Sequence, residues 1–158
     1  MLVRAAAVAA LLAVASAAVT AYWVLGGTAL LDTVGGYAED LARSVGPVPV
    51  LVGLLVVVVK IVGALVAAGL ARPPVGEWSR RLLLVAGALG SALLVVYGGL
   101  LVVVGALVLT DVLTPDGPID RRSLAWHVLV WDLWFLVWGM ALAVATLRSS
   151  RAGRRDRP

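Results

Sequence analysis

Four long apolar stretches, separated by short polar segments, make up most of this chain. They cover residues 2–25, 49–71, 82–110 and 124–147. Apolar runs of about 18 or more residues are typical of α-helices that cross the hydrocarbon core of a bilayer. The pattern therefore predicts an all-α integral membrane protein, a four-helix bundle that forms a single membrane domain over residues 1–158.

The composition supports this prediction and excludes several kinds of chemistry. Hydrophobic residues make up 62% of the chain and charged residues 14%, whereas soluble domains have about 45–50% and about 25%. A water-soluble domain of this length could not bury so much apolar surface. The absence of cysteine excludes thiol catalysis, disulfides and iron–sulfur ligation. Because His127 is the single histidine, we expect no metal site of several imidazoles, and no cofactor.

The first apolar stretch has two interpretations. It ends in Tyr22 and Trp23, whose rings prefer the membrane interface, and this favours a retained span. Alternatively, Arg4, the apolar run and the small residues 15–17 could form a secretory signal peptide with its cleavage site. We favour the retained span, because the run is long for a signal peptide and continues past that site.

The distribution of basic residues predicts the orientation of the four spans. If the N-terminus is cytoplasmic, the cytoplasmic segments hold nine basic residues and the outer loops hold three. Five of the nine lie in a basic tail, residues 148–158. Since cytoplasmic loops carry an excess of lysine and arginine, we expect both termini, and this tail, on the cytoplasmic side.

Two aromatic motifs resemble those of a known family. One is Tyr22-Trp23-x-x-Gly26-Gly27 at the end of the first span, and the other is Trp131-Asp132-x-Trp134-Phe135 in the fourth. Both resemble small four-helix bacterial membrane proteins that are known only as a domain of unknown function. The resemblance implies that the first span is retained. It brings no activity, substrate or site residues.

Two charged residues lie inside the predicted spans, Lys60 in the second and Asp132 in the fourth. A charge at the centre of a spanning helix costs about 2.5–3.5 kcal/mol on insertion scales, so it usually has a partner or a function. At 1.5 Å per residue, Lys60 lies ~16 Å and Asp132 ~12 Å from the outer end of its span. We therefore expect a buried Lys60–Asp132 ion pair. It could fix the helix register and nothing else, which we favour, or form a polar centre for passage of protons, ions or substrate.

The fourth span also carries His127 and the tryptophans Trp131, Trp134 and Trp138. These four residues form a candidate pocket for a lipid or quinone-like tail, although we favour packing of the rings against alanine- and glycine-rich helices. His127 precedes Asp132 by five residues. In a regular α-helix such residues lie about 140° apart, so we expect His127 to face away from Asp132, toward the interface.

The leading functional prediction is a non-enzymatic accessory or scaffold protein of the bacterial cytoplasmic membrane. Its expected partners are the lipid bilayer and a second copy or another membrane protein, with no nucleic acid. One alternative is a small oligomeric transporter or channel-like protein that uses Lys60 and Asp132. The other is a lipid- or quinone-binding protein or enzyme. A water-accessible cavity at Lys60 would favour transport. A groove beside Trp134 and Trp138 would favour lipid binding, and a dry, filled bundle would favour a scaffold role.

Overall fold

Four membrane-spanning helices make up most of the fold. The computed structural model describes residues 2–44, 46–72, 74 and 76–155, so that Arg157 of the basic tail lies outside the described residues. The spans are α1 (Leu2–Val24), α3 (Pro47–Ala71), α4 (Glu77–Leu109) and a fourth, continuous helix made of α5 (Arg121–Trp126), the π-helical turn η2 (His127–Trp131) and α6 (Asp132–Arg155). The predicted all-α membrane fold is confirmed.

The apolar surface of these helices faces outward. In α3, only 11% of an 18-residue apolar stretch is buried inside the protein. Over the whole helix the buried residues are Ala64, Ala67 and Leu70. Soluble proteins rarely expose a contiguous apolar surface of this size to water. Such a surface is suited to lipid, where each helix also satisfies its own backbone hydrogen bonds.

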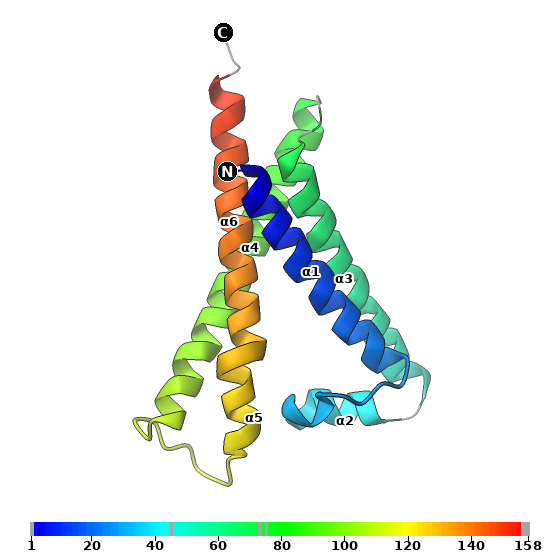
Figure 1. Cartoon of the computed structure of the whole chain (residues 1–158), viewed down its shortest axis with the longest axis vertical. Coiled ribbons are helices and arrows are strands. Elements are labelled where there is room, and N and C mark those ends of the chain that lie inside the picture. The colour runs from blue at the N-terminus through cyan, green and yellow to red at the C-terminus, as the bar shows by residue number, and fades with distance from the viewer. Residues whose placement is uncertain (1, 45, 73, 75, 156–158) are drawn as a thin grey trace.

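The helices pack as two pairs that cross at one end and diverge toward the other (Figure 1). In one pair α1 lies along α3, and in the other α4 lies along α6. α1 also packs against α6 where the pairs cross, on the side where both ends of the chain lie. The short helix α2 (Gly36–Arg43) lies at the end where the pairs diverge.

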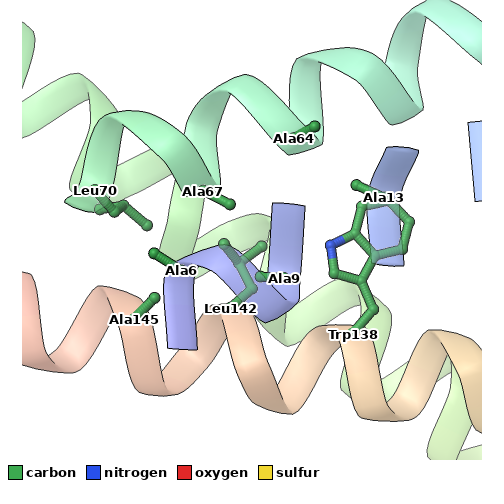
Figure 2. Close-up of a cluster of buried hydrophobic side chains, with 9 residues drawn as sticks. All are labelled: Ala6, Ala9, Ala13, Ala64, Ala67, Leu70, Trp138, Leu142 and Ala145. Carbon is green, nitrogen blue, oxygen red and sulfur yellow. The ribbon is translucent and has the colours of Figure 1, made fainter. Parts of the chain in front are cut away.

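Small residues allow the two pairs to cross closely (Figure 2). Ala6, Ala9 and Ala13, spaced by three and four positions, form a buried stripe on α1. Such a stripe lets neighbouring backbones approach in lipid. Trp138 of α6 reaches across to α3, where a Cβ added to Gly63 would lie 2.8 Å from its ring. The Trp138 ring therefore fills the space over Gly63.

α4 and α6 are held together at glycines. A Cβ added to Gly98 would lie 2.6 Å from the backbone N of Leu136 and 2.7 Å from the backbone O of Asp132. One added to Gly139 would lie 2.8 Å from the backbone N of Val95. These contacts join backbone to backbone, as expected for glycine in membrane helices, and they fix Asp132 against α4.

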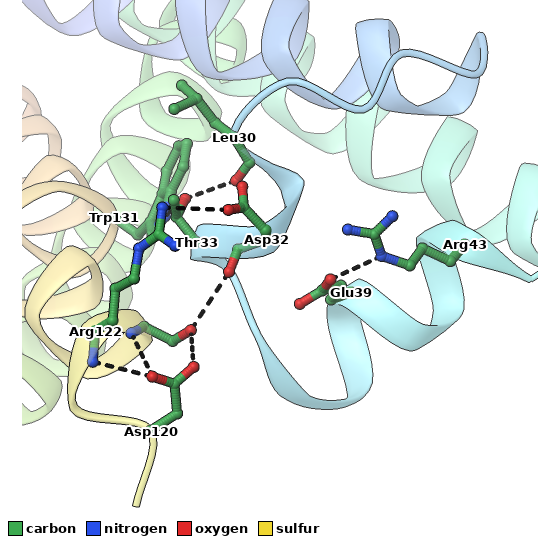
Figure 3. Close-up of polar contacts among 9 residues, drawn as sticks. Leu30, Asp32, Thr33, Glu39, Arg43, Asp120, Arg122 and Trp131 are labelled. Carbon is green, nitrogen blue, oxygen red and sulfur yellow. Dashed lines mark hydrogen bonds and ion pairs between the residues drawn. The ribbon is translucent and has the colours of Figure 1, made fainter.

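The loop that follows α1 folds back onto the start of the fourth span (Figure 3). We call residues 30–35, which include the short helix η1 (Leu31–Thr33), the docked segment. The Asp32 carboxylate pairs with Arg122 at 3.4 Å, and the Trp131 indole donates to Thr33 Oγ1 at 3.2 Å. Neither the docked segment nor α2 was predicted from the hydrophobic pattern, because both are short.

Candidate functional site

Two adjoining cavities lie where the helix pairs diverge. The larger, of about 790 Å³, is lined by the ends of α1 and α3 with α2 and the docked segment. The smaller, of about 210 Å³, lies among α1, α3, α4 and the fourth span. Both are lined by Thr20, Trp23, Val34, Ala38 and Lys60. Lys60 therefore lies where the two cavities meet.

Lys60 has its hydrogen-bond partners on α1. Its Nζ donates to Thr20 Oγ1 at 2.7 Å and to the backbone O of Ser16 at 3.3 Å. It also lies 5.8 Å from the centroid of the Phe135 ring. A lysine ammonium has three N–H donors, so these contacts leave one donor for another partner.

The ion pair expected between Lys60 and Asp132 is not formed among the described residues, where other partners hold both groups. The two residues do line the same smaller cavity. The reason lies in the packing. α3 packs along α1, whose Thr20 reaches Lys60, whereas Asp132 is reached by His127 of its own helix.

Asp132 is paired with His127 instead. His127 Nδ1 lies 3.2 Å from Asp132 Oδ1, and His127 Nε2 lies 2.7 Å from the backbone O of Val34 in the docked segment. The expectation that His127 faces away from Asp132 is therefore wrong. It assumed a regular α-helix, but residues 127–131 form a π-helical turn in which the backbone N–H of Asp132 bonds to the carbonyl of His127. This i→i+5 pattern brings side chains five positions apart onto one face.

The three tryptophans of the candidate pocket have different environments. Trp131 and Trp134 line the smaller cavity together with His127. The Trp134 indole donates to the backbone O of Leu12 at 3.1 Å, and Trp131 packs edge-on against Trp23 with the ring centroids 5.6 Å apart. Trp138 lies outside the cavity lining, in the buried core. The cavity therefore has a partly aromatic wall that tethers α1 and the docked segment to the fourth span.

Polar contacts outside the membrane hold the start of the fourth span. Asp120 caps α5 by accepting hydrogen bonds from the backbone N–H groups of Arg122 and Ser123. The Ser123 hydroxyl, 2.6 Å from Asp120 Oδ2, is the main reason that the pKa of Asp120 lies below its usual value. The pKa of Asp111 is lowered chiefly by its hydrogen bond to Arg121. These contacts position the helix that carries His127.

The comparisons with known proteins identify a family. Residues 11–142 match the family described as "Protein of unknown function (DUF3995)", and the chain belongs to that family. The match confirms the resemblance to a domain of unknown function that the aromatic motifs indicated. No curated protein and no solved structure matches the chain significantly.

Proposed function

We propose that this member of the family is a non-enzymatic, multi-pass protein of the bacterial cytoplasmic membrane that binds an amphipathic anion at Lys60. The observation that carries the proposal is the position of Lys60. It lies where two cavities meet, and among the described residues no carboxylate forms an ion pair with it. Both termini are cytoplasmic in this proposal, because basic residues are concentrated on that side.

The environment of Lys60 favours an anion. A charge inside a helix bundle is costly unless it is paired or hydrated. Thr20 and Ser16 supply two neutral oxygen acceptors, which leave the charge uncompensated. A bound anion would supply the missing counter-charge and accept the remaining N–H of the ammonium.

The cavity walls favour an anion with an apolar tail. Val24 of α1, Leu31 of the docked segment and Val52 and Val56 of α3 line the larger cavity. Its volume of about 790 Å³ lies within the range of about 300–1,000 Å³ that is typical of ligand sites. Val52 and Val56 are each 39% exposed, and in this proposal a ligand reaches Lys60 past them.

The cavities change the order of the functions considered from the sequence. A scaffold role was expected to need a dry, filled bundle, so it now ranks behind ligand binding. Transport of the same anion is the second candidate, because Lys60 lies between helix pairs that cross on one side and diverge on the other. The non-enzymatic role is supported by His127, both of whose ring nitrogens are already engaged.

A tryptophan-quenching titration tests anion binding. The protein, in phosphatidylcholine nanodiscs, is titrated with a long-chain alkyl sulfonate brominated in its tail, because bromine quenches nearby indoles such as Trp23. We expect saturable quenching that is lost in Lys60→Met and kept in Arg81→Met, which removes an exposed cation. The brominated alcohol with the same tail corrects for partitioning into lipid. The proposal is rejected if the sulfonate quenches the parent no more than the alcohol does, or if the sulfonate quenches the parent and Lys60→Met equally.

Single cysteines test the orientation, since the chain has none of its own. With a membrane-impermeant maleimide on intact cells, we expect labelling of Asp116→Cys in the third loop and not of Ser79→Cys in the first turn of α4. The reverse pattern would place the termini outside.

A further inference from the structure

We propose that His127 and Asp132 together form a proton-binding site, and that a proton is bound there together with the anion at Lys60. The anion in this inference is that of the proposed function. The proton is argued from the geometry of the pair itself, and it can be tested without any ligand.

The hydrogen-bond partners of His127 determine how many protons the pair holds. The carbonyl O of Val34 can only accept, so the His127 Nε2 that lies 2.7 Å from it carries a hydrogen. The 3.2 Å contact between Nδ1 and Asp132 Oδ1 needs a second hydrogen. This hydrogen belongs either to an imidazolium facing a carboxylate or to a carboxylic acid facing a neutral imidazole. In both cases the pair has no net charge.

Loss of the shared proton breaks one of the two contacts. If the remaining hydrogen stays on Nε2, the lone pair of Nδ1 faces the carboxylate of Asp132 without a proton between them. If it moves to Nδ1, the contact with Asp132 is restored, but Nε2 and the Val34 carbonyl become two facing acceptors. The protonated pair is therefore the form that fits both contacts.

The proton state of the pair changes the charge that Lys60 experiences. Lys60 and Asp132 line the same cavity of about 210 Å³. With the proton bound, the pair is neutral and Lys60 needs an outside anion. Without it, the pair carries one negative charge, which becomes an internal counter-charge for Lys60. Proton binding and anion binding therefore favour each other, as linkage requires.

The proton state also acts on the wall of the site. Val34 lines both cavities, and its carbonyl is the group that His127 holds. When the contact with Val34 is lost, the docked segment loses one of its links to the fourth span. We therefore expect deprotonation to loosen the cover of the anion site as well as to change its charge.

The other groups around the pair do not replace it as the proton site. The His127 side chain is 32% exposed and the Asp132 side chain 5%, so His127 gives the proton its access. Asp32 of the docked segment is already paired with Arg122 of α5. Of the other titratable or charged groups, Lys60 of α3 and Tyr97 of α4 line the same cavity as the pair. Asp32 of the docked segment, Asp120 and Arg122 lie at the start of the fourth span, where they are held by one another or by Ser123.

Calorimetry on the unmodified protein tests the coupling directly. The same alkyl sulfonate is titrated in buffers of different ionisation enthalpy, because its charge does not change with pH in the range used. We expect uptake of up to one proton per anion, and an affinity that weakens by up to tenfold per pH unit as the shared proton is lost. Binding of the sulfonate without proton uptake at every pH between 5 and 8 would overturn the inference.

Asp132→Asn is the matched variant. The amide keeps the size of the carboxylate and donates to Nδ1 while Nε2 still donates to Val34, so both contacts survive without the shared proton. We expect sulfonate binding that no longer depends on pH. A pH dependence equal to that of the parent would assign the proton to Lys60 or another group and reject the pair.

Hydrogen exchange separates a failure of this inference from a failure of the proposed function. Without ligand, and after correction for intrinsic exchange, amides 30–38 of the parent should exchange faster as pH rises from 5 to 8, and those of Asp132→Asn should not. If the exchange rates change with pH as expected while the sulfonate fails to bind, the proton site is supported and the proposed anion binding is rejected. If exchange in the parent does not change with pH, the proton site is rejected whatever binds at Lys60.

Discussion

His127 Nδ1 lies 3.2 Å from Asp132 Oδ1, although the two residues are five positions apart on one continuous helix. The π-helical turn between them brings the imidazole onto the face of the carboxylate. The same turn directs His127 Nε2 toward the docked segment. A local departure from α-helical geometry thus joins a buried carboxylate to the loop between α1 and α3.

Removal of one residue from the π-helical turn should preserve this contact. Deletion of Leu129, which is 68% exposed, converts the i→i+5 turn to regular α-helix and leaves His127 and Asp132 four positions apart, still on one face. We expect thermal stability in detergent close to that of the parent. Deletion of Leu133, in regular helix, rotates the two halves of the span by about 100° against each other and should lower stability severely. Equal losses for the two deletions would contradict this account.

Replacement of Lys60 should test whether it has a charged partner. Without ligand, Lys60→Met removes a charge that no carboxylate balances, so we expect stability equal to or above that of the parent. Thr20→Val should be less stable, since the ammonium loses an acceptor in a hydrogen bond of about 1.5–3 kcal/mol. The double variant should match Lys60→Met. A loss of about 3–5 kcal/mol in Lys60→Met would instead indicate the buried ion pair.

Two neighbouring glycines of α4 should respond oppositely to alanine. In Gly98→Ala the new methyl group meets the backbone of Leu136 and Asp132 at 2.6 and 2.7 Å, so α4 and α6 must separate. We expect a loss of about 1–3 kcal/mol. In Gly99→Ala it meets only a side-chain atom, Leu136 Cδ1, at 3.6 Å, and alanine raises helix propensity by up to about 1 kcal/mol. In thermal unfolding in detergent, Gly99→Ala should be at least as stable as the parent and Gly98→Ala less stable. If Gly98→Ala is the more stable variant, the close contact of Gly98 with α6 is disproved.

Acid should weaken the start of the fourth span. The pKa of Asp120 lies below the ordinary value of 3.8, chiefly through the Ser123 hydroxyl. Because the folded pKa is lowered, the contribution of Asp120 is complete above that ordinary value and is lost as pH falls through the folded pKa. Amide exchange at Arg122 and Ser123, measured against intrinsic rates, should rise below about pH 4. Asp120→Ala should exchange fast at every pH, and Asp111→Asn, which keeps the cap, should behave like the parent.

The sequence predicted the spans well and the polar contacts poorly. Long apolar runs are typical of membrane helices, and the bounds of the first two spans differ from those predicted by at most two residues. α4 begins five residues before the predicted start, and the fourth helix continues to Arg155, eight residues past the predicted end. The sequence places Lys60 in the second span, but its partner depends on which helix lies beside α3. The sequence did contain an indication of this partner. Ser16 and Thr20, which accept hydrogen bonds from Lys60, are the only serine and threonine of α1.

The contact between His127 and Asp132 could not be predicted from regular helix geometry. Spacing arguments assume 3.6 residues per turn, and a single π-helical turn reverses their conclusion. The docked segment was also missed, because its position depends on tertiary contacts such as that between Asp32 and Arg122 rather than on a hydrophobic pattern. Trp138 illustrates the opposite case, since its packing over Gly63 is the ring-against-small-residue contact favoured from the sequence.

The most direct test of the account is the anomalous scattering of bromine in crystals of the protein grown with the brominated alkyl sulfonate. We predict that the bromine peak lies in the larger cavity, between α1 and α3, with a sulfonate oxygen within about 3 Å of Lys60 Nζ. Lys60→Met crystals grown in the same way should lack that peak. Bromine found only on the outer faces of the helices, with Lys60 still bonded to Thr20 and Ser16 alone, would contradict the central claim that this site binds an amphipathic anion.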